Sequence, residues 1–185
     1  MPKPPLRIVR EKAALVVIDI QERLVPPISG NETLLKNAVR LIKGCGILKV
    51  PTLVTEQYPK GLGATVPAIA TALGEFSPFE KTVFSACGAE GVRDALNDKD
   101  VADAILCGIE THVCVAQTCL DFLERGLRVF VVSDAVSSRS EADHQLALQR
   151  MRDSGAIIVS TEMILFELLQ RAGTPEFKEV QALIK

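Results

Sequence analysis

Three residues with reactive side chains stand at or just after short apolar runs of the 185-residue chain: Asp19, Lys81 and Cys114. A thiol, a carboxylate and an ammonium group are the parts needed for nucleophilic catalysis with acid–base assistance. Thr111 is a candidate N-cap, which puts Cys114 near the third position of a helix. There the positive helix end lowers the pKa of a thiol, and a nearby Lys81 would lower it further. Asp19 would accept the thiol proton and later deliver it to a leaving group.

Each of these residues also has a purely structural interpretation. A cysteine in a helix is most often a small buried hydrophobe. An aspartate at a strand end often accepts hydrogen bonds from loop N–H groups. A lysine beside Glu80 is typical of a solvated surface. From the residues alone both interpretations stay open. The choice depends on whether the predicted strands and helices bring the three side chains together.

Apolar runs alternate with amphipathic stretches along the whole chain. The runs are short, rich in β-branched residues and apolar on both faces, which is typical of a covered parallel sheet. The predicted strands are residues 13–18, 50–55, 82–84, 102–107, 127–132 and 156–160. The predicted helices run from 31 or 33 to 49, then cover 66–73, 89–97, 111–125, 140–154 and 162–172, with a last helix from 175.

This alternation predicts βαβ units with right-handed crossovers. The fold class is therefore α/β, a three-layer α/β/α sandwich, with residues 1–185 forming a single domain. Ligands of such folds bind outside the carboxyl ends of the strands, at the point where the strand order reverses. Asp19 and Cys114 both follow predicted strands, so this rule points to two of the three residues that the chemistry singles out.

Composition argues against several classes of function. The chain has 21 basic and 23 acidic residues, no Trp and one Tyr, so nucleic-acid binding is disfavoured. The run Ala13–Ile18 is too short for a signal sequence or a membrane span. The five cysteines are odd in number and lack C-x-x-C spacing, so no disulfide framework is predicted. We expect a soluble, cytoplasmic protein with no membrane or nucleic-acid partner.

Several stretches together resemble a known family. Asp19-Ile-Gln21, the Lys81 segment and Gly108-Ile-Glu-Thr-His-Val-Cys114-Val resemble the isochorismatase-like cysteine hydrolases, which include nicotinamidases and N-carbamoylsarcosine amidases. Residues 55–63, 134–140 and 151–155 are similar to isochorismatase domain-containing proteins. The resemblance covers nearly the whole chain. It implies a six-stranded parallel sheet in the order 3-2-1-4-5-6, with strands one and four adjacent and Lys81 reaching across from the edge strand.

The resemblance also implies a role for each residue. The Cys114 thiolate would attack an amide carbonyl and form a thioester. Backbone N–H groups of Glu110 and Cys114 would form the oxyanion hole, beside a cis peptide between Ile109 and Glu110. Asp19 would protonate the leaving amine and then activate water, while Lys81 orients Asp19 and stabilises the thiolate. No cofactor is implied.

The same edge of the sheet supplies a predicted substrate pocket, made of Gln21, Leu24, Tyr58, Phe84 and His112. Tyr58 and Phe84 are equally consistent with plain packing, and His112 is expected to point aside. His144 is expected on the surface, and Asp134 and Arg139 are expected to form a capped loop with a salt bridge.

Two departures from the family pattern narrow the chemistry. Nicotinamidases place metal ligands after the second strand, but residues 56–60 contain no His, so we predict no metal and disfavour nicotinamide. True isochorismatases cleave a vinyl ether and lack the nucleophilic cysteine that is present here as Cys114. The predicted activity is hydrolysis of a small amide-like substrate. The alternatives are vinyl-ether cleavage through Asp19 and a non-catalytic scaffold.

The predicted partners are a small, largely uncharged substrate and further copies of the chain. Apolar helices around residues 164–169 suggest a homo-oligomer, a dimer or a tetramer. A redox pair of Cys114 and Cys119 is not expected, because the two lie five positions apart on different faces of one predicted helix.

Overall fold

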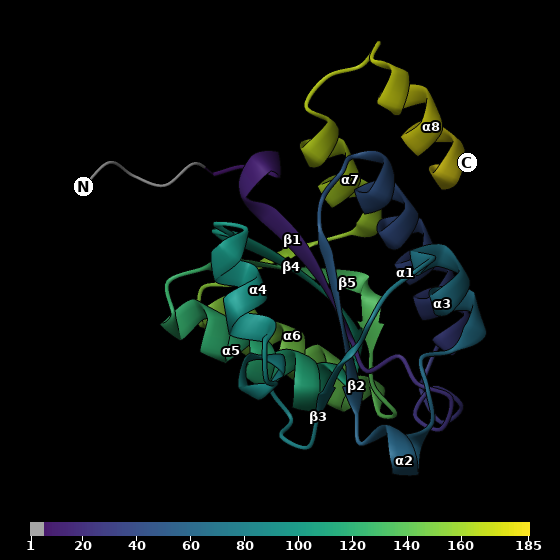
Figure 1. Ribbon diagram of the computed structural model, residues 1–185, viewed down its shortest axis with the longest axis vertical. Coiled ribbons are helices and arrows are strands. Elements are labelled where there is room, and N and C mark those ends of the chain that lie inside the picture. Colours follow the sequence, from purple (N-terminus) through teal and green to yellow (C-terminus); the bar gives the residue numbers. More distant parts are fainter. Residues whose placement is uncertain (1–5) are drawn as a thin grey trace.

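One parallel sheet organises the computed structural model, which describes residues 6–185 (Figure 1). Its order, β3-β2-β1-β4-β5-β6, confirms the predicted topology, and all five neighbouring pairs are parallel. The six strands are β1 (Ala13–Ile18), β2 (Thr52–Gln57), β3 (Phe79–Lys81), β4 (Asp103–Ile109), β5 (Arg128–Ser137) and β6 (Ile157–Val159).

Helices cover both faces of this sheet, as Figure 1 shows. One layer holds α1 (Asn31–Ile47), α3 (Pro67–Leu73), α7 (Thr161–Leu169) and α8 (Pro175–Ile184). The other holds α4 (Val92–Asp98), α5 (Ala116–Glu124) and α6 (Glu141–Asp153). The short elements are α2 (Pro59–Leu62), two 3₁₀ turns, η1 (Arg10–Lys12) and η2 (Ala86–Gly88), and a π turn, η3 (Thr111–Val115).

The central strand β1 shows why the sheet needs both layers. All six of its residues are buried. Leu15 and Val17 pack with the α1 layer, whereas Val16 and Ile18 pack with the α5 layer. Successive side chains of a strand point to opposite faces, so a strand without polar positions requires cover on both sides. The three-layer architecture therefore follows from the unbroken apolar run.

The predicted position of the third strand, residues 82–84, is wrong, because the strand lies directly before it at Phe79–Lys81. The strand is β3, which ends at Lys81, and residues 82–84 form an exposed segment after it. Val83 and Phe84 have the apolar character of a strand but remain about half exposed, at 49% and 52%. Lys81 consequently ends an edge strand, and the segment after it is available to fold back over the site.

The strand order reverses between β1 and β4. From β1 the chain builds outward to β2 and β3, and it then returns to place β4 on the other side of β1. Ile18 of β1 pairs with Gly108 of β4, so the chain leaves the sheet in diverging directions just beyond this pair. This is the switch point at which α/β folds bind ligands.

The helix α7 packs mainly on its own chain, and burial of its exposed side chains against a partner stays a prediction. Most apolar side chains of α7, Ile164, Leu165, Leu168 and Leu169, lie in the core beneath α1. Met163 and Phe166 keep 53% and 38% of their side chains exposed.

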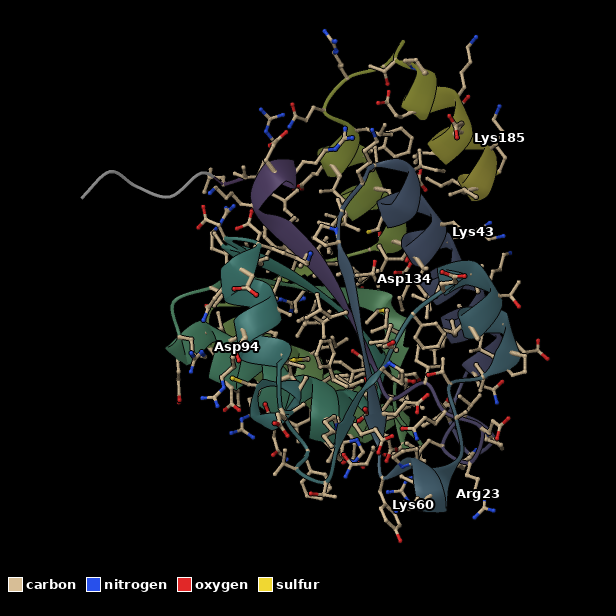
Figure 2. All side chains as sticks on the ribbon, viewed as in Figure 1. Arg23, Lys43, Lys60, Asp94, Asp134 and Lys185 are labelled. Carbon is tan, nitrogen blue, oxygen red and sulfur yellow. The ribbon has the colours of Figure 1, made fainter. Side chains whose placement is uncertain are left out.

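Many charged side chains lie on the outer surface. Lys43, Lys60, Asp94 and Lys185 are exposed and point away from the sheet in Figure 2. In the described part of the chain, no helix has the length and apolar character needed to cross a membrane.

The close approach of β1 and β4 yields a first prediction. Gly108 has φ +126°, and a Cβ there would lie 2.0 Å from the carbonyl oxygen of Ile18. Gly108→Ala should therefore lower the free energy of unfolding by about 3 kcal/mol or more, measured by denaturant unfolding. Gly46→Ala is the control, because a Cβ there meets nothing within 4 Å. It should stabilise α1 by about 0.5–1 kcal/mol. Equal effects of the two changes would contradict this account.

Candidate active site

Asp19 is held in an uncommon backbone conformation at the end of β1. Its φ is 52°, and its side chain is fully buried. Thr55 Oγ1 donates a hydrogen bond of 2.7 Å to Oδ1, and Lys81 Nζ donates one of 2.6 Å to Oδ2. A non-glycine residue at positive φ persists only where its surroundings hold it, and such residues cluster at functional sites. Here the two hydrogen bonds fix the carboxylate at the switch point.

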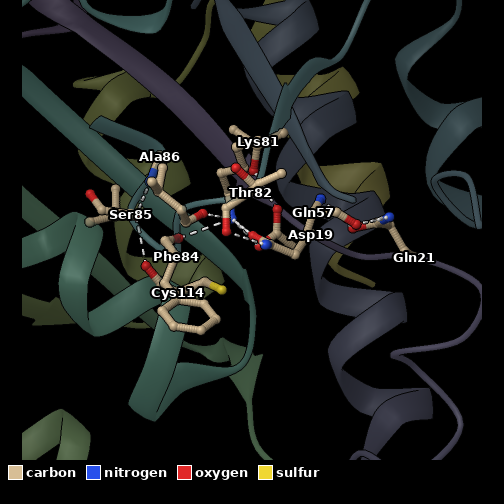
Figure 3. A network of polar contacts seen from close by, with 12 residues as sticks. Asp19, Gln21, Gln57, Lys81, Thr82, Phe84, Ser85, Ala86 and Cys114 are labelled. Atoms are coloured by element: carbon tan, nitrogen blue, oxygen red, sulfur yellow. Dashed lines mark hydrogen bonds and ion pairs between the residues drawn. The ribbon is translucent and has the colours of Figure 1, made fainter. Parts of the chain in front are cut away.

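Lys81 reaches Asp19 from the edge strand across β2. Lys81 pairs with Gln57 of β2 in the sheet, yet its ammonium group is buried beside Asp19 on β1. Nζ also donates to Gln57 Oε1 at 2.7 Å and to the Phe84 carbonyl oxygen at 2.9 Å. Figure 3 shows this cluster, with Lys81 pointing toward Asp19 and Gln57. The long side chain and the folded-back segment 82–84 together account for the crossing.

Cys114 lies in the π turn between β4 and α5, and its side chain is 7% exposed. Burial, together with the Asp19 carboxylate, raises the pKa of its thiol to about 12, while the Lys81 ammonium opposes both effects. The predicted lowering of this pKa is therefore wrong. The N-cap of the turn is Glu110, not the predicted Thr111, and Glu110 makes no side-chain capping hydrogen bond. The loss of water around the sulfur outweighs any helix-end effect. The resting group is a thiol with a carboxylate and an ammonium beside it.

The segment before Cys114 contains the predicted oxyanion-hole residues. The peptide between Ile109 and Glu110 is cis. The Glu110 carbonyl accepts hydrogen bonds from Val113 N and Val115 N, at 3.1 and 3.2 Å. The Glu110 carboxylate accepts hydrogen bonds from the backbone N and Nε of Arg139, at 2.9 and 3.0 Å. The turn is thus tied to the loop after β5, and the expected salt bridge of Arg139 is made with Glu110.

Two histidines lie close to this turn. His144 is buried, contrary to the surface position expected for it, and its Nδ1 lies 2.9 Å from Thr111 Oγ1. Burial lowers the pKa of His144, so the neutral ring is favoured. His112 Nδ1 lies 2.9 Å from Ser138 Oγ, which agrees with the expectation that His112 points aside. Asp134 Oδ1 accepts from the backbone N and the hydroxyl of Thr161, in the capping role expected for it.

The five predicted pocket residues have different surroundings. Gln21 is fully buried, and its amide bonds the backbone of Gln57 and Gly63, so it supports the loop. Leu24 is partly buried against the core. Tyr58 and Phe84 are 54% and 52% exposed, and His112 is partly exposed. A cavity of about 290 Å³ beside Lys81 includes Tyr58 in its lining but not Cys114 or Asp19.

Three supporting residues were not predicted from sequence: Thr55, Gln57 and Thr118. Thr55 pairs with Ile18 of β1 and therefore lies beside the following Asp19. A register argument for parallel strands one and two would have indicated it. Gln57 and Thr118 act through hydrogen bonds to segments that follow β3, and nothing in their local sequence signals those contacts.

The residues at the end of β2 do not fit a metal ion. Glu56 Oε1 accepts hydrogen bonds of 2.7 Å from both the backbone N and the hydroxyl of Thr65. The Gln57 amide is engaged by Lys81 and by the Thr82 carbonyl. Among residues 6–185, no group of three or more His, Cys, Asp or Glu side chains is arranged to hold a metal.

Comparison with known proteins places the chain in a family. The family described as "Isochorismatase domain" matches residues 13–163. Isochorismatase domain-containing protein 2 of Danio rerio is 44% identical over 179 residues, which are 96% of this chain and 89% of the fish protein. The chain belongs to the isochorismatase family.

Solved structures agree with this assignment. A structure described as MAR1 ribonuclease from Caenorhabditis elegans is 47% identical, with a TM-score of 0.91, and the match covers 96% of this chain and 92% of that one. YcaC of Escherichia coli, described as an octameric hydrolase of unknown specificity, is 24% identical with a TM-score of 0.88, over 98% and 92% of the two chains. At that identity YcaC shows the fold alone. The chain has the fold of the isochorismatase-family hydrolases.

The environment of Cys114 yields a second prediction. Because its pKa is about 12, alkylation of Cys114 by iodoacetamide should be slow at pH 6 and rise about tenfold per pH unit through pH 10. Asp19→Asn removes a negative charge that raises this pKa, so the variant should react several times faster at pH 8. Peptide-mapped mass spectrometry measures both rates. Cys45, a fully buried residue of α1, reports any general unfolding. Rapid labelling of Cys114 at pH 6 would rule out the proposed effect of burial.

Proposed function

We propose that the protein is a cysteine hydrolase that cleaves a small amide-like substrate through Cys114, Asp19 and Lys81. The observation that carries the proposal is the 2.6 Å contact between Lys81 Nζ and Asp19 Oδ2, with both side chains fully buried beside the Cys114 thiol. A buried ion pair costs several kcal/mol per ion in lost hydration, so its placement next to a nucleophile at the switch point favours a catalytic role.

Acylation follows from the resting state of the thiol. The Cys114 sulfur attacks the substrate carbonyl as its proton passes to the Asp19 carboxylate, and an S–C bond forms. The negative charge moves to the carbonyl oxygen, which the backbone N–H groups of Glu110 and Cys114 stabilise as the oxyanion hole. Asp19 then gives its proton to the leaving nitrogen, the C–N bond breaks and an amine departs. The enzyme retains the acyl group as a thioester.

Deacylation returns a proton to the Cys114 sulfur through the same Asp19 side chain. Asp19, again a carboxylate, takes a proton from water as the water oxygen attacks the thioester carbonyl. The C–S bond breaks, Asp19 returns the proton to the Cys114 sulfur, and a carboxylic acid departs. One carboxylate thus serves as base and acid in both halves. Lys81 keeps its charge throughout, which balances Asp19 whenever Asp19 is ionised.

The substrate class follows from the side chains at the exposed edge of the site. Tyr58, Phe84 and His112 supply partly exposed aromatic side chains, and we propose that they contact a small, largely uncharged substrate. The protein acts in this proposal as a single cytoplasmic domain over residues 1–185, without cofactor, as a homo-oligomer such as a dimer or tetramer. YcaC, described as octameric, shows that this fold also occurs in larger assemblies.

Ribonuclease activity is a second candidate because of the 47% identity to the nematode protein described as MAR1 ribonuclease. The chain's formal charge of −2 gives it no basic excess for phosphates, which is why the amide remains our first choice. Vinyl-ether cleavage through Asp19 and the role of a non-catalytic scaffold rank below these two activities.

A panel of small primary amides, an isochorismate-like vinyl ether and an RNA oligonucleotide distinguishes these functions. We expect amide turnover that Cys114→Ala lowers by roughly 10³-fold or more, with Asp19→Asn similarly impaired. Cys45→Ala, a cysteine on the other face of the sheet, should retain activity within about twofold. Vinyl-ether turnover that survives Cys114→Ala would replace our proposal with the Asp19 mechanism. RNA cleavage lost in Cys114→Ala would favour the ribonuclease.

A further inference from the structure

Thr118, on α5 one turn beyond Cys114, uses its hydroxyl for two hydrogen bonds. It is fully buried. Its Oγ1 donates to the Cys114 carbonyl oxygen at 2.7 Å and accepts from the backbone N–H of Ala86 at 2.8 Å. One hydroxyl therefore joins the nucleophile's own backbone to a segment that is distant in sequence.

The same segment also accepts a hydrogen bond from the Lys81 side chain. Residues 82–86 leave β3 and fold back, and the Phe84 carbonyl accepts the hydrogen bond from Lys81 Nζ. Ala86, two residues further on, is the residue bound to Thr118. Figure 3 shows Lys81, Phe84, Ala86 and Cys114 gathered at this point. A path of hydrogen bonds from the Lys81 ammonium to the Cys114 carbonyl thus passes through Phe84, Ala86 and Thr118.

The sheet alone does not set the distance between Lys81 and Cys114. Lys81 ends β3 and Cys114 follows β4, and two strands, β2 and β1, lie between them. Residues 82–84 are exposed and belong to no helix or strand. Because no strand pairing links the two groups directly, the Thr118 hydroxyl bridges the segments that carry them.

We infer that Thr118 is a positioning residue. Its hydroxyl couples the Cys114 turn to the segment that binds Lys81, and so fixes the position of the ammonium relative to the thiol. The inference rests on the proposed function for its catalytic meaning. The coupling itself is a property of the free protein and is measurable without substrate.

The test compares alkylation of Cys114 by iodoacetamide at pH 8 in variants of the full chain. Thr118→Val keeps the shape but removes both hydrogen bonds, and Thr118→Ser restores the hydroxyl. Because the Lys81 ammonium lowers the pKa of Cys114, weaker coupling should slow alkylation. We expect Thr118→Val to react about three- to tenfold more slowly, and Thr118→Ser to stay within about twofold of the unchanged protein. Where amide turnover is present, kcat should fall more than KM rises.

Thr161→Val is the matched control. Thr161 is also a buried threonine near the start of a helix, and its hydroxyl donates to Asp134 at 2.9 Å, in the layer on the opposite face of the sheet. Its loss should leave Cys114 alkylation within about twofold, even if the unfolding midpoint drops.

A double-mutant cycle with Lys81→Met separates coupling from general loosening. If Thr118 acts through Lys81, Thr118→Val should change alkylation less than about twofold once Lys81 is absent. An effect of the same size in both backgrounds would overturn the inference, as would a Thr118→Ser protein as slow as Thr118→Val. Thr118→Ala is judged by the same criteria if the valine variant does not fold by circular dichroism. Coupling without turnover on any amide would refute the proposed function and leave the positioning role intact.

Discussion

The ion pair between Lys81 and Asp19 is the interaction on which the rest of the site depends. Both charges are fully buried at 2.6 Å, and each would be costly without the other, since removing one partner of such a pair costs about 3–5 kcal/mol. The remaining hydrogen-bonding capacity of both groups is met by neutral neighbours: Thr55 for the carboxylate, and Gln57 and Phe84 for the ammonium. The pair is therefore fixed in orientation as well as in position.

This constraint explains features that otherwise look unrelated. The positive φ of Asp19 turns its carboxylate toward β2 and β3 at the point where β1 ends. The early end of β3 frees residues 82–86 to fold back and bring the Phe84 carbonyl to the ammonium. Gly108 leaves room for β1 and β4 to approach where the chain turns toward Cys114. Each is a local departure from regular structure, and all three help to position groups in the same small region of the site.

Burial also sets the chemistry that the site can perform. A thiol with a raised pKa stays protonated, and the buried Asp19 carboxylate lies beside it. In the proposed mechanism, loss of the thiol proton is therefore coupled to formation of the S–C bond.

The sequence by itself determined the sheet, both of its helix layers and the three side chains at the strand ends. These follow from local patterns, because unbroken apolar runs require cover on both faces and ends of parallel strands share one edge. The tertiary structure decided what depends on contacts between distant segments. It set where β3 ends, how Lys81 crosses β2, the buried position of His144 and the bridge from Thr118 to Ala86. It also reversed the expected pKa shift of Cys114, because desolvation is summed over every segment that packs around the sulfur, and no local spacing records that sum.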